Sequence, residues 1–354
     1  MKYDYIVIGF GIAGMTITFQ LLREGKTVLV IDGNTTKASH VAAGMYNPVI
    51  LKRFTLAWHA TELMEYAAVF YNDLGVFLEV KTTEDLPVYR KFYSVEEQNN
   101  WFAAIDNPSL SNYMSPYLKK EASKVIDAPF KYGEVKKTGR LLVKNVFSQF
   151  KTKLEKENGF VVGEVDFNTI QIEKNTIQIN GYSCNKLIFC EGYGMQANPY
   201  FNYLPLVGNR GAYLIIKSTD LDLKVAIKSQ YFLIPLGGDL YKFGATYPNH
   251  KQIRKVADAD FEKHTLETAF KKLTDASYSI IDFVAAIRPT VKDRRPLLGM
   301  HPKYKNMFVF NGLGTRGVTL APKNSQMLID FLERDVALAS EINIKRYETF
   351  YDQI

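Results

Sequence analysis

A glycine-rich turn near the N-terminus is the feature that most constrains this chain. The segment Gly9-Phe10-Gly11-Ile12-Ala13-Gly14 follows an apolar, β-rich run from Tyr3 to Ile8. It opens a stretch, ended by Gly25, in which apolar residues recur at helical spacing: Ile12, Met15, Phe19 and Leu22. This order predicts a strand, a tight turn and a helix whose N-terminus faces an anion.

The spacing of the three glycines is typical of dinucleotide-binding βαβ units. Gly9 permits the tight turn, Gly11 lets a pyrophosphate approach the backbone, and Gly14 lets the helix pack on the strand. A second apolar run, Thr27 to Ile31, ends at Asp32, where such folds place the acceptor for the ribose hydroxyls. A tight turn without any ligand is the alternative, and the complete βαβ pattern argues against it.

Composition places the chain among ordinary globular proteins. Its 354 residues predict two domains or one discontinuous pair, and no apolar stretch is long enough to span a bilayer. We therefore expect a cytoplasmic protein with no membrane span. Cys184 and Cys190 are expected to be reduced core residues. Histidine and cysteine spacings typical of metal sites are absent, as is a GxSxG elbow, which argues against metal and serine-hydrolase chemistry.

The net charge of +7 allows an anionic partner, such as an anionic cofactor, an acidic substrate or RNA. Basic residues occur as scattered pairs and not as a long run: Lys119-Lys120, Lys136-Lys137, Lys271-Lys272 and Arg294-Arg295. Such pairs are typical of solvated faces. The charge pattern therefore favours a small-molecule partner over nucleic acid.

The rest of the chain predicts elements of two different sheets. A helix over 148–157 leads into a β-meander, with strands over 160–166, 169–173, 176–179 and 186–190, which ends in a second glycine turn at Gly192. A separate sheet is predicted between 201 and 285, with strands over 212–217, 230–235 and 240–247 and a helix over 258–273. A last strand, 307–310, leads through a glycine-rich loop to a helix with Pro322 in its first turn.

Five further motifs occur in order along nearly the whole chain. They are Ser-His-Val-Ala-Ala-Gly-Met at 39–45, the strand and turn at 187–192, Pro-x-x-x-x-Arg-Gly at 205–211, a strand ending in Pro235 with Gly-Ala-Thr at 244–246, and Ile-Arg-Pro at 287–289 with Arg-Arg-Pro-Leu-Leu-Gly at 294–299. On these the chain resembles the D-amino-acid oxidase superfamily, in its glycine oxidase and sarcosine oxidase branch.

The resemblance implies an α/β fold of the glutathione-reductase-like flavoprotein architecture. A discontinuous Rossmann-like FAD-binding domain is expected over residues 1–80, 140–200 and 286–354. A second domain, an antiparallel-sheet substrate domain, is expected over 81–139 and 201–285.

FAD is the cofactor that the resemblance implies, with the flavin between residues 43–45 and the loop 314–319. Amides at a helix N-terminus there can stabilise the negative charge of a reduced flavin, although an ordinary loop before a helix is the alternative. Sarcosine oxidase has a tethering cysteine where this chain has Ala286, and His40 is one residue from the tethering position of dimethylglycine dehydrogenases, so we expect non-covalent FAD. The expected cofactor-binding residues are Gly9, Gly11, Gly14, Asp32, Ser39, Ala43, Gly44, Met45, Val165, Gly192, Gly314, Arg316, Gly317 and Thr319.

Three residues are expected to act on the substrate or on oxygen. The resemblance implies that Arg288 binds the substrate carboxylate, for which a guanidinium is suited. The alternative role for Arg288 is a structural ion pair. The resemblance implies that Tyr247 lines the substrate cavity, and a half-buried strand tyrosine is the alternative. It also implies that Lys242 lies near flavin N5, and an exposed strand lysine is the alternative. Phe232 stands where glycine oxidase has a substrate-contacting tyrosine, which departs from the glycine oxidase pattern.

The expected activity is oxidation of the C–N bond of a small amino acid or secondary amine to an imine. Electrons would pass to oxygen or to another acceptor. The segment Ala43-Gly44-Met45-Tyr46-Asn47-Pro48 is also similar to the oxidase domain of the bifunctional tRNA wobble-uridine enzyme, so oxidation of a carboxymethylamino group of RNA is an alternative. A flavoprotein without catalytic activity is a further alternative.

Overall fold

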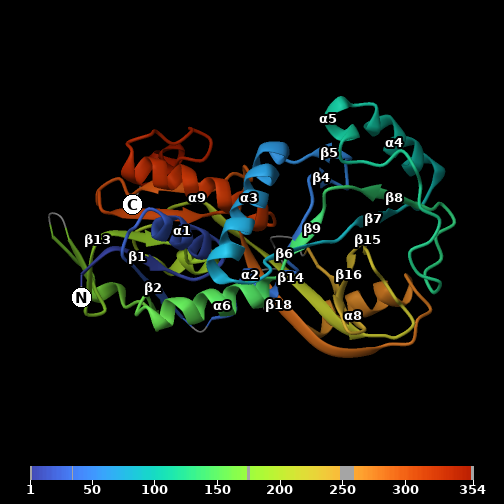
Figure 1. Cartoon of the computed structure of the whole chain (residues 1–354), viewed down its shortest axis with the longest axis horizontal. Coiled ribbons are helices and arrows are strands. Elements are labelled where there is room, and N and C mark those ends of the chain that lie inside the picture. The colour runs from blue at the N-terminus through green and yellow to red at the C-terminus, as the bar shows by residue number, and fades with distance from the viewer. Residues whose placement is uncertain (1, 34, 174–175, 248–258, 352–354) are drawn as a thin grey trace.

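The protein, described here from a computed structural model, has two lobes that are each built on a large β-sheet (Figure 1). The structure describes residues 2–33, 35–173, 176–247 and 259–351. Among these residues no helix is long and apolar enough to cross a membrane.

The first sheet has eight strands with a parallel centre. The parallel strands run in the order β10 (Phe160–Val162), β2 (Val28–Asp32), β1 (Lys2–Ile8), β13 (Tyr182–Phe189) and β20 (Met307–Asn311). Antiparallel strands extend it: β12 (Ile177–Ile179), β11 (Gln171–Ile172) and β19 (Leu297–Met300). Tyr5 and Val7 face one core and Ile6 and Ile8 the other. Burial on both faces explains why the second half of β1, residues 5–8, is continuously apolar.

Four helices cover one face of this sheet: α1 (Ile12–Arg23), α3 (Ala60–Leu78), α6 (Val143–Lys156) and α9 (Gly317–Glu333). Helix α1 ends as the sequence predicts. Gly25 has a φ of +71° and its N–H donates to the Leu22 carbonyl, while the Lys26 N–H donates to the Leu21 carbonyl. This pattern is a Schellman cap, which favours glycine because of the left-handed φ.

The expectation for Pro322 is wrong in detail, because this proline lies inside α9 and not in its first turn. A proline has no N–H, so the carbonyl four residues earlier, that of Val318, loses its helical partner. The hydroxyl of Tyr71 on α3 donates to that carbonyl at 2.7 Å. The packing of α3 against α9 therefore satisfies the group that the proline leaves free.

The second sheet has seven strands, which are antiparallel except for one parallel pair, β15 with β7. Their order is β18 (Ser279–Val291), β14 (Leu206–Lys217), β17 (Leu240–Gly244), β16 (Phe232–Gly237), β15 (Ala226–Lys228), β7 (Val88–Lys91) and β8 (Tyr132–Val135). One face packs on α8 (Ala259–Lys271) through Leu266 and Phe270. Trp101 on α4 (Val95–Ile105) anchors a further core that covers part of the sheet.

Short elements complete the fold. A three-stranded sheet has the order β3 (Met45–Tyr46), β9 (Gly139–Leu141) and β6 (Thr83–Asp85). The other short elements are α2 (Ala38–Val41), β4 (Val49–Ile50), β5 (Thr55–Leu56), α5 (Pro108–Ser111), α10 (Glu348–Tyr351) and 3-10 helices over Phe167–Thr169, Gly192–Ala197 and Ile344–Tyr347.

The expected α/β class with a Rossmann-like sheet and a second, antiparallel sheet is confirmed. Several predicted bounds are wrong. The strand expected over 160–166 ends at Val162, and a 3-10 turn follows because the Asp166 side chain accepts the N–H of Asn168. The helix expected from 148 begins at Val143, and Asp258, the expected start of α8, lies outside the described residues. The domain division stays a prediction, and β18 crosses its boundary at residue 286.

Candidate active site

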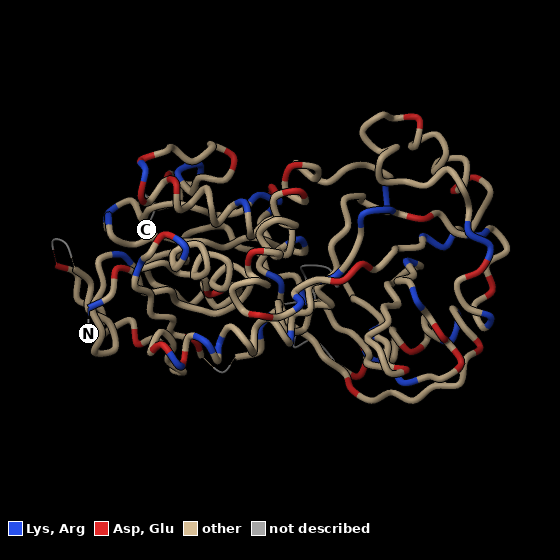
Figure 2. The backbone as a smooth tube through the Cα atoms, viewed as in Figure 1, with Lys and Arg blue, Asp and Glu red and all other residues tan. Residues whose placement is uncertain are grey.

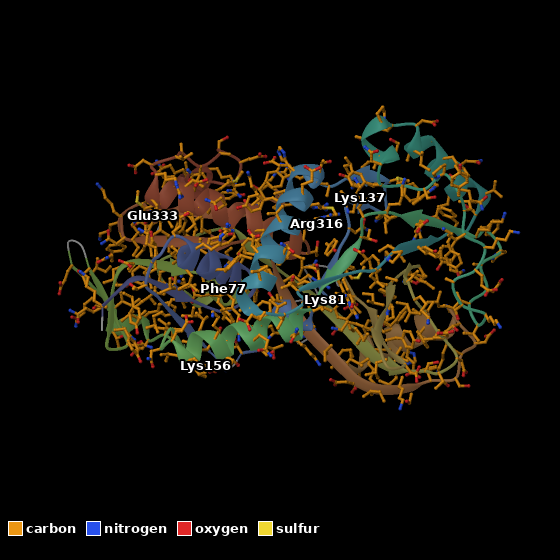
Figure 3. All side chains as sticks on the ribbon, viewed as in Figure 1. Phe77, Lys81, Lys137, Lys156, Arg316 and Glu333 are labelled. Atoms are coloured by element: carbon orange, nitrogen blue, oxygen red, sulfur yellow. The ribbon has the colours of Figure 1, made fainter. Side chains whose placement is uncertain are left out.

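A cleft of about 1290 Å³ is lined by residues from both lobes. All the predicted site residues line it except Gly14 and Lys242: Gly9, Gly11, Asp32, Ser39, Ala43, Gly44, Met45, Val165, Gly192, Tyr247, Arg288, Gly314, Arg316, Gly317 and Thr319. Segments far apart in the sequence thus meet at one surface. Figure 3 labels Arg316 in the middle of the molecule and Glu333 on the first lobe, so α9 begins at the junction of the lobes.

The glycine turn has the geometry of a phosphate cradle. A Cβ at Gly14 would overlap the Gly9 carbonyl oxygen, which explains the third glycine as a packing residue behind the cleft. At Gly11 a Cβ would meet only the Ser39 hydroxyl, at 3.4 Å, so this position is open to a ligand. The backbone N–H groups of Gly11 and Ala13 have no acceptor within the described protein. Free amides at a helix N-terminus fit a pyrophosphate.

Asp32 and Ser39 hold this turn in place from outside it. The Phe10 N–H donates to Oδ1 of Asp32 at 2.7 Å, and the Ile12 N–H donates to Oγ of Ser39 at 2.9 Å. Lys37, which the sequence reasoning did not single out, lies with Nζ 2.8 Å from Oδ2 of Asp32. Each carboxylate oxygen keeps a further lone pair for a ribose hydroxyl.

The opposite wall of the cofactor region comes from two further backbone turns. Gly44 has a φ of +71°, and a Cβ there would overlap the Leu141 carbonyl. At the start of α9 the N–H groups of Gly317 and Val318 have no acceptor within the described residues. Arg316 donates to the Asn47 carbonyl at 2.9 Å, and burial lowers its pKa. The helix N-terminus therefore presents amides and a guanidinium to the cleft, as the flavin hypothesis requires.

The side chain of Arg288 on β18 lies over Gly211 on the neighbouring strand β14. A Cβ at position 211 would overlap the guanidinium, so the glycine makes room for this side chain. Nη1 donates to Oδ1 of Asn209 at 3.0 Å, and the guanidinium carbon lies 5.0 Å from the ring centroid of Tyr247. Burial raises the pKa of Tyr213, and the neighbouring Arg288 opposes that rise.

None of the ion pairs among the described residues uses Arg288. The structure thus gives no support to the structural ion pair that was the alternative for this residue. A guanidinium with neutral partners keeps donors for an incoming carboxylate. Tyr247 is 61% exposed at the edge of the same cleft, so it is not the half-buried strand tyrosine of the alternative.

Lys242 lies behind the cleft wall and not in its lining. It is only 7% exposed, and Nζ donates to the Val41 carbonyl at 2.7 Å, next to the Ala43 and Gly44 turn. The ammonium lies 5.1 Å from the ring centroid of Tyr213. Burial lowers the pKa of Lys242 to about 8, and Lys144 adds to this effect. Lys242 is therefore not an exposed strand lysine, which was the alternative prediction from the sequence.

Glu191 and Lys228 are among the further cleft residues with ionisable side chains that the sequence reasoning missed. Burial raises the pKa of Glu191 to about 7, and Asn198 donates to its Oε2 at 2.6 Å. Lys228 on β15 also lines the cleft. Glu191 could have been noticed from its place at the C-terminal end of a strand, whereas Lys228 needs the strand register.

Comparisons with known proteins agree with this site. The profile of the DAO family, described as FAD dependent oxidoreductase, matches residues 4–330. An uncharacterized oxidoreductase, YurR, of Bacillus subtilis strain 168 is 22% identical over 90% of this chain and 92% of its own length. The bifunctional protein MnmC of Legionella pneumophila strain Philadelphia 1, of tRNA 5-methylaminomethyl-2-thiouridine biosynthesis, is 20% identical over 94% of this chain, which spans only 54% of that relative.

Among solved structures, glycine oxidase from Geobacillus kaustophilus superposes with a TM-score of 0.77 at 15% identity, covering 98% of each chain. This likeness shows a shared fold. The free amides at Gly11 and at the start of α9 lie on the cleft where a dinucleotide would be held. The family profile covers most of the chain, and the chain belongs to the FAD-dependent oxidoreductases of the DAO family, with FAD as its cofactor.

Proposed function

We propose that this enzyme oxidises the C–N bond of a small amino acid or secondary amine that carries a carboxylate. The observation that carries the proposal is Arg288, a guanidinium on the cleft with neutral partners and, within the described residues, no acidic one. Charge-assisted bidentate contacts with a carboxylate are among the strongest hydrogen bonds that proteins make. The glycine oxidase fold supports the same substrate class.

In this proposal Arg288 holds the substrate carboxylate while Gly211 and Tyr247 fix the plane of the guanidinium. The amine reacts in its neutral form, so the site needs no strong general base. FAD, when bound, would supply the acceptor for the hydride that leaves the α-carbon. As the hydride leaves, the nitrogen lone pair would form the C=N bond, and after loss of a proton to water the imine would be hydrolysed to a carbonyl compound and ammonia or an amine.

Lys242 is proposed to act on the oxygen step. Its ammonium is held by the Val41 carbonyl beside the Ala43 and Gly44 turn, which the proposal places against the flavin. A buried cation stabilises the negative charge that develops as oxygen is reduced. The electron acceptor would then be oxygen itself.

A second candidate is oxidation of a carboxymethylamino group on tRNA. The similarity to MnmC favours it, although this chain spans about half of that protein. Figure 2 shows Lys and Arg interspersed with Asp and Glu over both lobes in this view, and no basic stripe is visible there. The RNA interpretation therefore ranks below a free amine or amino acid.

The test is anaerobic bleaching of the flavin absorbance with glycine, sarcosine, proline, D-amino acids and carboxymethylaminomethyl-uridine. We expect at least one carboxylate-bearing amine to reduce the flavin, and the R288A variant to raise its KM about 10-fold to 100-fold, because a hydrogen bond to a charged group is lost. R288K should recover little, since the fork geometry is absent. An unchanged KM in R288A would remove Arg288 from the site.

A further inference from the structure

Lys228 is a cation on the cleft that the proposed function does not use. Lys228 is the last residue of β15, and its Nζ donates to the Gln230 carbonyl at 2.6 Å. The ammonium also lies 5.0 Å from the ring centroid of Phe232. Like Arg288, it takes part in none of the ion pairs among the described residues.

Strand register shows that Lys228 faces the same side of the sheet as the Arg288 region. Tyr213 lies opposite Gly244, Gly244 opposite Phe232, and Phe232 opposite Lys228. Directly paired residues project from the same face of a sheet. The next row packs into the opposite core under α8: Leu214, Phe243, Leu233 and Ile227. Tyr213, Phe232 and Lys228 of this row line the cleft. At Gly244, between them, the Tyr213 ring occupies the space that a Cβ would need.

The surroundings of Lys228 give its charge no acidic partner among the described residues. Its neighbour across the β15–β7 pair is Arg90, which is itself paired with Glu97 and donates to the Ser229 carbonyl at 2.8 Å. Burial lowers the pKa of Lys228 to about 8, with Arg90 adding to the effect. A desolvated cation gains more from an incoming anion than an exposed one does. An anion in the cleft would therefore be a favourable partner for Lys228.

We propose that Lys228 and Arg288 bind the two ends of a ligand with two carboxylates, so that the substrates of this enzyme are amino acids or amines with a second carboxylate remote from the oxidised carbon. This inference rests on the proposed function, because it assigns the first carboxylate to Arg288.

The strand positions set the length of such a ligand. Tyr213, beside Arg288, and Lys228 are three strand spacings apart, or about 14 Å at the level of the backbone. We take the two cationic groups to be separated as their strands are and allow about 3 Å for each charge-assisted contact, which leaves about 8 Å between the contacting oxygens. With C–C bonds of about 1.5 Å, this is the length of an acid of roughly five to eight carbons.

The experiment titrates the FAD-loaded enzyme with acetate, malonate, adipate and suberate, following the flavin absorbance. We expect adipate or suberate to bind about 10-fold to 100-fold more tightly than acetate, and malonate, which is too short, to show no such gain. In K228M the ratio of the acetate and dicarboxylate Kd values should fall to about 1, and in K228R it should be restored. The control is K224M, since the Lys224 side chain is 87% exposed.

A dicarboxylate advantage that survives in K228M, or equal Kd values for acetate and every dicarboxylate in the parent, would overturn the inference. If K228M loses its flavin, K228Q takes its place, and the chain-length series in the parent is decisive by itself. A different result would mean that the proposed function has failed: acetate leaves the flavin spectrum unchanged, or binds equally well to R288A.

Discussion

Replacing Lys242 with methionine is expected to make the protein more stable while slowing the reaction of its reduced flavin with oxygen. Lys242 is 7% exposed, and its ammonium donates one hydrogen bond to the Val41 carbonyl and lies over the Tyr213 ring. Burial of this charge without an acidic partner costs the folded state free energy. Methionine has a similar length and carries no charge, so it removes that cost.

The size of the gain follows from the pKa of Lys242, which falls from 10.5 to about 8 in the folded protein. At about 1.4 kcal/mol for each pH unit, keeping the charge costs the folded state about 3 kcal/mol. Losing the hydrogen bond to the Val41 carbonyl takes back about 1 kcal/mol. We therefore expect K242M to raise the free energy of unfolding by roughly 1 to 2 kcal/mol at pH 7.

The difference in stability between parent and K242M should depend on pH. Because the folded pKa lies below the unfolded one, the cost is fully present below about pH 8 and fades as the pH rises toward 10.5. Urea denaturation of parent and K242M, with the same excess of FAD, should show a constant difference up to pH 8 that shrinks above it. The control is K217M, because Lys217 is exposed at the end of β14.

Stopped-flow measurement of the two half-reactions tests the role in oxygen chemistry. K242M should slow reoxidation and change reduction by substrate much less, and reoxidation in the parent should slow as the pH rises through about 8. Equal oxygen rates in both proteins would make Lys242 a structural residue only. A variant no more stable than the parent, or a difference in stability that does not change above pH 8, would refute the electrostatic reasoning.

Three other experiments have definite expected outcomes. Acid precipitation should release FAD into the supernatant, because Ala286 replaces the tethering cysteine, and flavin in the pellet would contradict this. G44A should lose FAD and unfold at lower urea, since a Cβ would overlap the Leu141 carbonyl at a positive φ, and a normal absorbance spectrum would count against it. Y71F should lower the free energy of unfolding by about 1 to 2 kcal/mol, because the Val318 carbonyl, which Pro322 leaves without a helical partner, loses the Tyr71 hydroxyl as donor, and an unchanged urea midpoint would show that this bond contributes nothing.

Local features of the sequence determined the cofactor half of the site. The glycines at 9, 11 and 14 and the Schellman glycine at 25 act over a few residues through φ and through close contacts. A short segment carries that information, because turn geometry and helix periodicity depend on neighbours along the chain. The same holds for Asp32, whose place at the end of β2 follows from the βαβ order.

Only the tertiary structure decided what surrounds the substrate region. Arg288 was singled out from its dipeptide, but its neutral partners Asn209 and Tyr213 come from another strand. Lys228 carries no local signal, because its place on the cleft depends on the register of four strands joined by separate connections. Whether a lysine is buried and whether an arginine has a carboxylate beside it are properties of packing between distant segments, and no window of the sequence records them.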